Sequence, residues 1–209
     1  MKLSSSSFSD GQKIPGDHSF CIPDPAHHVC LGRNRNPQLA WSDAPTGTKS
    51  FVVICHDPDV PSQGDDVNQE GRSVPAALPR VDFFHWVLVD LPPSLSTIQE
   101  GEFSSEVTPR GKPGPQTAHG ARQGINNYTD WFAGDHDMCG DYYGYDGPCP
   151  PWNDEIVHRY VFTVFALDVE TLPVDGKFGG PEVRAAMQGH ILAQASLTGR
   201  YTLNPLLQG

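Results

Sequence analysis

Three runs of β-branched and aromatic residues dominate the pattern of hydrophobic and polar positions: 51–56 (FVVICH), 83–90 (FFHWVLVD) and 160–168 (YVFTVFALD). Pro, Asp or Gly residues bound these runs, as is typical of strands that end in turns. In the third run, apolar residues occupy both odd and even positions, which indicates a strand covered on both faces. The pattern therefore predicts three buried central strands.

The rest of the chain combines irregular stretches with one segment of helical spacing. The stretches 61–80 and 106–152 are polar and rich in Gly and Pro, so we expect long loops there, and such loops often carry function. From Val183 onward every fourth residue to position 195 is apolar, Pro181 precedes this segment and Gly199 follows it. This spacing predicts a C-terminal helix of about four turns that packs on the strands as a lid.

Composition and charge narrow the class of protein. Apolar residues make up 37% of the chain, and 21 Gly and 20 Pro suit a single, mostly β domain over 1–209. The net charge is −11 with only 14 basic residues, so nucleic-acid binding and stable membrane association lack an electrostatic basis. No apolar run could span a membrane, and residues 1–10 lack the apolar core of a signal peptide, so we expect a cytoplasmic protein.

Five cysteines in a chain of this size favour reduced thiols over a disulfide framework. A bridge between Cys21 and Cys30, or between Cys139 and Cys149, stays open as an alternative. Neither spacing resembles a zinc knuckle.

The first candidate for chemistry is the segment 56–61 (HDPDVP), where we expect the first strand to end in a turn. Two prolines stiffen this turn and fix the carboxylates of Asp57 and Asp59. The alternative is an Asx-type turn in which these carboxylates only cap backbone N–H groups. An Asp-x-Asp metal site is a weaker alternative, because proline occupies the middle position.

His85 is the second candidate, because a polar ring inside an apolar strand needs a hydrogen-bond partner. Alternation places it on the face of Val87 and Val89. The alternative is a core histidine that one hydrogen bond to a carbonyl or carboxylate satisfies.

The third candidate is the run 144–151 (GYDGPCPP), followed by His158 and Tyr160 on one face of the next strand. Glycine in this run lets main-chain N–H groups approach an oxyanion, whereas the alternative is a proline-rich loop without a ligand. If the three segments converge, carboxylates would orient the imidazoles so that their outward N–H groups donate to a phosphate or carboxylate oxygen. The sequence then predicts a receptor for a small anionic or phosphorylated ligand.

Catalysis is not expected from these residues. The chain has no nucleophile-elbow serine, no HExxH and no Walker-type run, and nothing in the sequence near Cys149 would activate a thiolate. We therefore assign no catalytic residue, no metal and no cofactor.

Four ordered motifs resemble those of the phosphatidylethanolamine-binding proteins, and the bacterial and archaeal branch, often called Raf kinase inhibitor-like, fits best. These motifs are 57–61 (DPDVP), 85–92 (HWVLVDLP), 144–151 (GYDGPCPP) and 158–160 (HRY). The resemblance implies a β-sandwich of two antiparallel sheets with a C-terminal helix and few short helices. It also implies a non-enzymatic binding protein that regulates a partner protein such as a kinase, and relatives in this branch suggest a homodimer.

The resemblance places seven residues around a small anion-binding cavity: Asp57, Asp59, His85, Gly147, Pro148, His158 and Tyr160. The chain departs from the family pattern at Asp146, where glycine is usual, and at 152–155 (WNDE), where a Gly-containing link is usual. We expect the added negative charge to weaken anion binding.

Two other functions stay open. The aromatic, acidic loop 126–152, which includes an insertion at 126–143, would make the chain a protein-interaction module with a residual cavity. A metal-assisted hydrolase is the third hypothesis, because side chains of the types present at Asp57, Asp59, His136 and His158 bind metals.

Overall fold

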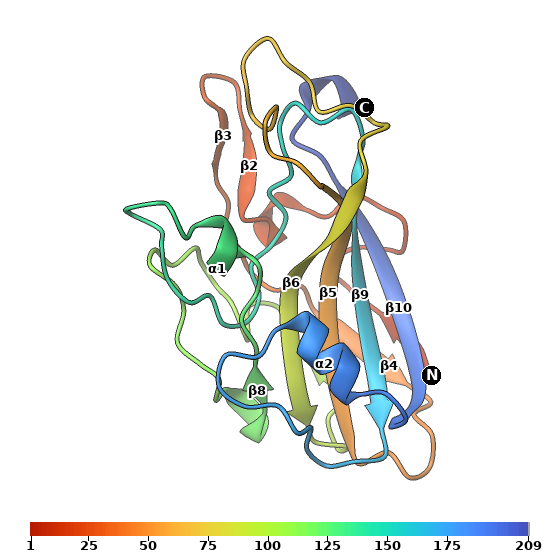
Figure 1. The fold of residues 1–209 in the computed structure, drawn as a ribbon. Coiled ribbons are helices and arrows are strands. Elements are labelled where there is room, and N and C mark those ends of the chain that lie inside the picture. Colours follow the sequence, from red (N-terminus) through yellow and green to blue (C-terminus); the bar gives the residue numbers. More distant parts are fainter. Residues whose placement is uncertain (209) are drawn as a thin grey trace.

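The computed structural model describes residues 1–208 and contains one large antiparallel sheet. Its five strands have the spatial order β10–β9–β5–β6–β8 (Figure 1). Their bounds are β5 Ser50–Pro61, β6 Arg80–Leu91, β8 Arg122–Gln123, β9 His158–Leu167 and β10 Ile191–Tyr201. The three strands predicted from the sequence are β5, β6 and β9, and they are the central strands of this sheet.

A smaller antiparallel sheet packs against the large one and completes the sandwich. It consists of β1 (Lys2–Ser4), β4 (Leu39–Ser42) and β7 (Thr97–Ile98), and a separate hairpin joins β2 (Cys21–Asp24) to β3 (His28–Leu31). The helices are short: α1 Tyr128–Trp131, α2 Gly180–Ala186, and three 3-10 turns at Gly16–His18, Ala118–Gly120 and Pro205–Leu207. The expected β-sandwich with few helices is therefore confirmed.

The core forms two layers, one on each face of the large sheet. Alternation along β5 places Phe51, Val53 and Cys55 in the layer between the two sheets, whereas Val52 and Ile54 pack beneath α2. Figure 1 shows α2 lying across this second face. Both faces of the sheet are covered, which agrees with the apolar residues at odd and even positions that the sequence showed in the run 160–168, now part of β9.

A β-bulge in β6 aims His85 away from the residues with which simple alternation groups it. Cys55 pairs with Trp86 and the next residue, His56, pairs with Phe84, so His85 is the extra residue. Val87 and Val89 pack in the layer beneath α2, whereas His85 lies on the opposite face. The prediction that His85 shares a face with these valines is therefore wrong.

The segment 56–61 is not a turn after a strand, as the sequence suggested, but the last part of β5. Its pairing with β6 is irregular between Asp57 and Val60. The backbone N–H of Asp59 donates to Oδ1 of Asp57 at 2.7 Å, so an Asx-type turn forms inside the strand. Asp57 comes before the irregular pairing, and regular alternation along β5 places it on the face that continues from Val53 and Cys55.

The predicted four-turn C-terminal helix is correct only over its first half. Helix α2 begins at Gly180 with Pro181 in its first turn, and Oε2 of Glu182 accepts the N–H of Gly179 at 3.0 Å. Gly189 has a φ of 83° and ends the helical path. Residues from Ile191 onward pair with β9 as strand β10, because that pairing satisfies the free edge of β9.

The cysteines depart from both sequence-based alternatives. Cys21 and Cys149 form a disulfide across 128 residues of sequence, while Cys30, Cys55 and Cys139 are free. For Cys21 and Cys149, the expectation of reduced thiols is therefore wrong. Among the described residues, no helix is long and apolar enough to cross a membrane.

Candidate ligand-binding site

A pocket of about 480 Å³ is lined by residues of β5, β6 and β9, of the β2–β3 hairpin and of the loop that carries α1. Figure 1 shows that these elements meet at one end of the large sheet. Four of the seven residues predicted from the sequence line the pocket: Asp57, His85, His158 and Tyr160. The other three, Asp59, Gly147 and Pro148, are not among its lining residues. The structure thus brings the acid of the first motif together with both histidines.

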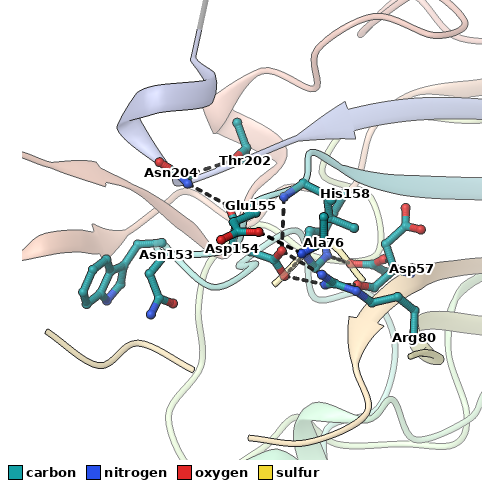
Figure 2. A network of polar contacts seen from close by, with 12 residues as sticks. Asp57, Ala76, Arg80, Asn153, Asp154, Glu155, His158, Thr202 and Asn204 are labelled. Carbon is teal, nitrogen blue, oxygen red and sulfur yellow. Dashed lines mark hydrogen bonds and ion pairs between the residues drawn. The ribbon is translucent and has the colours of Figure 1, made fainter. Parts of the chain in front are cut away.

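A buried chain of charged groups runs through one wall of the pocket (Figure 2). Nδ1 of His158 lies 2.7 Å from Oδ2 of Asp57, and Nε2 lies 3.0 Å from Oδ2 of Asp154. Asp154 in turn accepts both terminal nitrogens of Arg80, with 3.0 Å between Nη2 and Oδ1. Both nitrogens of His158 are therefore committed within the protein.

The charges in this chain compensate one another. Burial alone would lower the pKa of His158, but hydrogen bonds to Asp154 and Asp57 outweigh it and raise the pKa to about 9. Burial would likewise raise the pKa of Asp154, but His158 and Arg80 hold it below its usual range. His158 is therefore an imidazolium between two carboxylates, and it has no N–H left for a ligand.

His85 is held by the segment that follows Tyr145. Its Nδ1 lies 2.7 Å from the backbone oxygen of Asp146, and its ring packs edge-on against Tyr160 with 5.1 Å between centroids. Burial lowers the pKa of His85, although Asp57 and the Asp146 carbonyl act in the opposite direction. At neutral pH the ring is therefore uncharged.

The carboxylate of Asp146, a departure from the family pattern, is buried and turned away from the pocket. Its oxygens accept from Nδ2 of Asn34 and Nδ2 of Asn126, both at 2.7 Å, and Nζ of Lys112 lies 3.0 Å away. Because these groups satisfy and neutralise it, Asp146 adds no free negative charge to the pocket. The physical basis for expecting weaker anion binding from Asp146 is therefore missing.

The remaining predicted residues support the wall from behind. Asp59 forms an ion pair with Arg159, with 2.7 Å between Oδ1 and Nη2. The backbone N–H of Gly147 donates to Oδ1 of Asn34 at 2.8 Å, so it cannot form the expected nest for an oxyanion. The carbonyl of Pro148 accepts the N–H groups of residues 20 and 21, which fastens this loop to β2.

Most of the pocket wall is apolar, and the sequence analysis did not assign its residues. They include Phe20, Phe83, Tyr128, Trp131, Phe132 and Met138, together with the Cys21–Cys149 disulfide. Asn127 positions the loop that carries several of them, because its Oδ1 accepts the N–H of Phe84 at 2.7 Å. The aromatic loop 126–143 had been singled out, but only the tertiary fold shows that it faces the cavity.

The metal hypothesis gains no geometric support. In the part of the chain that the structure describes, no three His, Cys, Asp or Glu side chains gather as metal ligands. Asp59 is engaged by Arg159, and His136 is an exposed side chain whose Nδ1 lies 2.9 Å from Oδ1 of the adjacent Asp137. The four residues of that hypothesis therefore do not form one cluster.

Comparisons with known proteins identify the family of this chain. The family model described as phosphatidylethanolamine-binding protein matches residues 4–202. The UPF0098 protein YbhB of Escherichia coli is 34% identical over 203 residues, which are 97% of this chain and 100% of YbhB. A UPF0098 protein of Aquifex aeolicus is 33% identical over 201 residues, which are 96% of this chain and 88% of that protein.

Solved structures show the same fold. Escherichia coli YbcL, described as a new member of the mammalian PEBP family, superposes with a TM-score of 0.68 at 26% identity and covers 96% of this chain and 97% of its own. A homologue from Chlamydia trachomatis superposes with a TM-score of 0.63 at 30% identity and covers 96% and 95%. With a family match over nearly its whole length, this chain belongs to the phosphatidylethanolamine-binding protein family.

Proposed function

We propose that the protein binds, without converting it, a small amphiphilic ligand that carries a phosphoryl or similar anionic head group. Family membership supports a binding protein, and the family description names a ligand with a phosphoryl head group and apolar chains. The observation that carries the proposal is the division of the pocket into two parts. Asp57, His85 and Tyr160 provide a polar end, while aromatic side chains provide an apolar wall.

The apolar wall explains how a ligand without strong ionic contacts could be held. Phe20 stacks on Tyr128 with 4.6 Å between ring centroids, and Tyr128 stacks on Phe132 at 5.5 Å. Burial of apolar ligand surface against such rings contributes roughly 25 cal/mol per Å². A head group attached to a ring or chain should therefore bind more tightly than the isolated head group.

Calorimetric titration with phenyl phosphate and with inorganic phosphate tests this proposal. We expect phenyl phosphate to bind about tenfold or more tightly, which corresponds to roughly 1.4 kcal/mol. Trp131→Ala should weaken the binding of phenyl phosphate and leave the binding of inorganic phosphate unchanged, because Trp131 lines the pocket. Trp131 is 55% exposed, so its loss should disturb the core little. Val81→Ala, at an exposed position of β6 outside the pocket, is the matched control. Failure of both probes to bind would overturn the proposal.

A second candidate function is contact with a partner protein, such as the kinase expected from the resemblance, at the edge of the pocket. Leu31 of β3 is 59% exposed, and it lines the same pocket as the exposed Trp131. Exposed apolar residues beside a pocket suit a protein contact. Leu31→Ser combined with Trp131→Ser should abolish complex formation with such a kinase, and an unchanged complex would exclude this surface.

A further inference from the structure

The polar end of the pocket offers an anion few hydrogen-bond donors. Within residues 1–208, no Lys or Arg side chain lines the pocket. Both nitrogens of His158 are engaged by Asp57 and Asp154. Among the described residues, His85 is therefore the lining histidine that still has a nitrogen for a ligand.

The hydrogen bond of His85 fixes its tautomer. A carbonyl oxygen only accepts, so Nδ1, at 2.7 Å from the oxygen of Asp146, carries the ring proton. Nε2 has no hydrogen-bond partner in residues 1–208. In the same residues, the side-chain nitrogen and oxygen atoms that are both fully buried and without a partner belong to Ser19, Trp41, His56 and Arg80. Nε2 of His85 has no partner and is not one of these atoms, so it is not fully buried and reaches the open space of the pocket. In the neutral ring this atom presents a lone pair.

Titratable groups face His85 from each element packed against it. They are Asp57 of β5, Tyr128 of α1, Asp146 of the loop between α1 and β9, and His158 and Tyr160 of β9. Burial raises the pKa of Tyr128 and of Tyr160 well above the usual value, and both hydroxyls stay protonated. His158, with a pKa of about 9, stays charged. Between about pH 7 and pH 8.5, His85 is therefore the group at this end of the pocket that is poised to take up a proton.

We propose that the pocket takes up one proton together with the phosphoryl head group and holds it between a phosphoryl oxygen and Nε2 of His85. This inference rests on the proposed function. A fully ionised oxygen placed against the Nε2 lone pair would be repelled, since neither atom supplies a hydrogen. The complex gains a charge-assisted hydrogen bond once a single proton lies between them.

Proton uptake gives a distinctive pH dependence. A phosphate monoester has a second pKa of about 6, so above pH 7 the free ligand is mostly a dianion. The neutral His85 and the dianion then carry one proton fewer than the complex. The dissociation constant should rise about tenfold per pH unit from about pH 7 to pH 8.5.

Calorimetry of phenyl phosphate binding at pH 7.5, in two buffers of different ionisation enthalpy, measures this uptake directly. We expect about one proton per complex. Saturable binding without proton uptake would overturn the inference and leave the proposed function standing. Absence of binding at both pH 6 and pH 7.5 would overturn the proposed function, and the inference with it.

His85→Gln provides a second test, because an amide donates an N–H without titrating. In this variant the uptake should fall toward zero and the dissociation constant should become nearly independent of pH. His190→Gln is the matched control, since His190 pairs with Asp168 outside the pocket, and it should keep the full uptake. Full uptake in His85→Gln would also overturn the inference. The wild-type measurement is decisive by itself if this variant fails to fold.

Discussion

Nδ1 of His158 lies 2.7 Å from Oδ2 of Asp57, and at most 1% of either side chain is exposed. The opposite ring nitrogen donates to Asp154, so two buried carboxylates share one imidazolium. Removal of the proton would leave both carboxylates without a positive partner on this ring, at a depth where water cannot solvate them. The site therefore links the protonation of His158 to the stability of the fold.

The free energy of unfolding should decrease between about pH 7 and pH 8.5. The pKa of His158 is about 9 in the folded protein, against 6.5 for an unperturbed histidine. A raised pKa gives stability that is complete below the unfolded pKa and is lost as the pH rises through the folded one. The unfolding constant should therefore increase by up to about tenfold per pH unit in urea titrations.

The other histidines with a shifted pKa should not change the stability between pH 7 and pH 8.5. Burial lowers the pKa of His56 and of His85, so their contributions are complete above pH 7 and are lost only as the pH falls. A stability that stays constant from pH 7 to pH 8.5 would contradict the assignment of His158 as a buried imidazolium.

Asp154→Asn should destabilise the fold by roughly 3 kcal/mol, because it removes the carboxylate that joins His158 to Arg80. With one carboxylate left, the pKa of His158 should also decrease, and the loss of stability should begin at a lower pH. Asp168→Asn is the control: its ion pair with His190 is solvent-exposed and should contribute less than about 1 kcal/mol. Chemical denaturation of both variants measures the difference, and equal effects would refute a special role for Asp154.

The position of Asp154 shows how far sequence reasoning could reach. The segment 152–155 departs from the family pattern, and from the sequence alone we interpreted it as added negative charge near an anion-binding site. In the structure Asp154 lies between His158 and Arg80, a residue 74 positions earlier in the chain. Local sequence predicts a carboxylate, whereas only the fold determines which cations neutralise it.

The same distinction applies to the backbone. The apolar runs of β5, β6 and β9 identify the central strands because burial on both faces leaves a local signal. The bulge at His85 leaves no local signal in the sequence, because it depends on the register between β5 and β6. Apolar residues from Val183 to position 195 fit a helix, yet the available edge of β9 draws the second half into a strand, and tertiary pairing overrides local spacing.

Gly199 offers a test of this strand. It lies opposite Tyr160 in the sheet, and a Cβ atom there would lie 2.3 Å from Cγ1 of the fully buried Ile14. Gly199→Ala should therefore destabilise the fold by about 2 kcal/mol through overpacking. Gly134→Ala is the control, because no atom lies within 4 Å of the added methyl group, and it should change stability by less than about 0.5 kcal/mol. Thermal denaturation of both variants tests the register, and equal stabilities would contradict it.

The Cys21–Cys149 disulfide should contribute both to stability and to ligand binding. It closes a loop of 128 residues, and the loss of such a cross-link typically costs roughly 2–5 kcal/mol. Both cysteines also line the pocket, beside Phe20 and Pro150. Without the disulfide, the loop that carries Cys149 should be less tightly held, and the apolar side chains should pack less closely around a ligand. Cys149→Ser should therefore lower the unfolding temperature, and it should weaken the binding of phenyl phosphate more than the binding of inorganic phosphate.

Cys139→Ser separates these effects from the loss of a thiol, because Cys139 is a free and exposed cysteine of the same loop region. A reducing agent should reproduce the Cys149→Ser result in the wild-type protein and leave Cys149→Ser itself unchanged. The backbone hydrogen bonds from residues 20 and 21 to the Pro148 carbonyl do not involve the sulfur atoms. We therefore expect them to persist without the disulfide, so that the pocket loosens rather than collapses. Equal affinities for phenyl phosphate in the oxidised and reduced protein would show that these hydrogen bonds alone hold the wall.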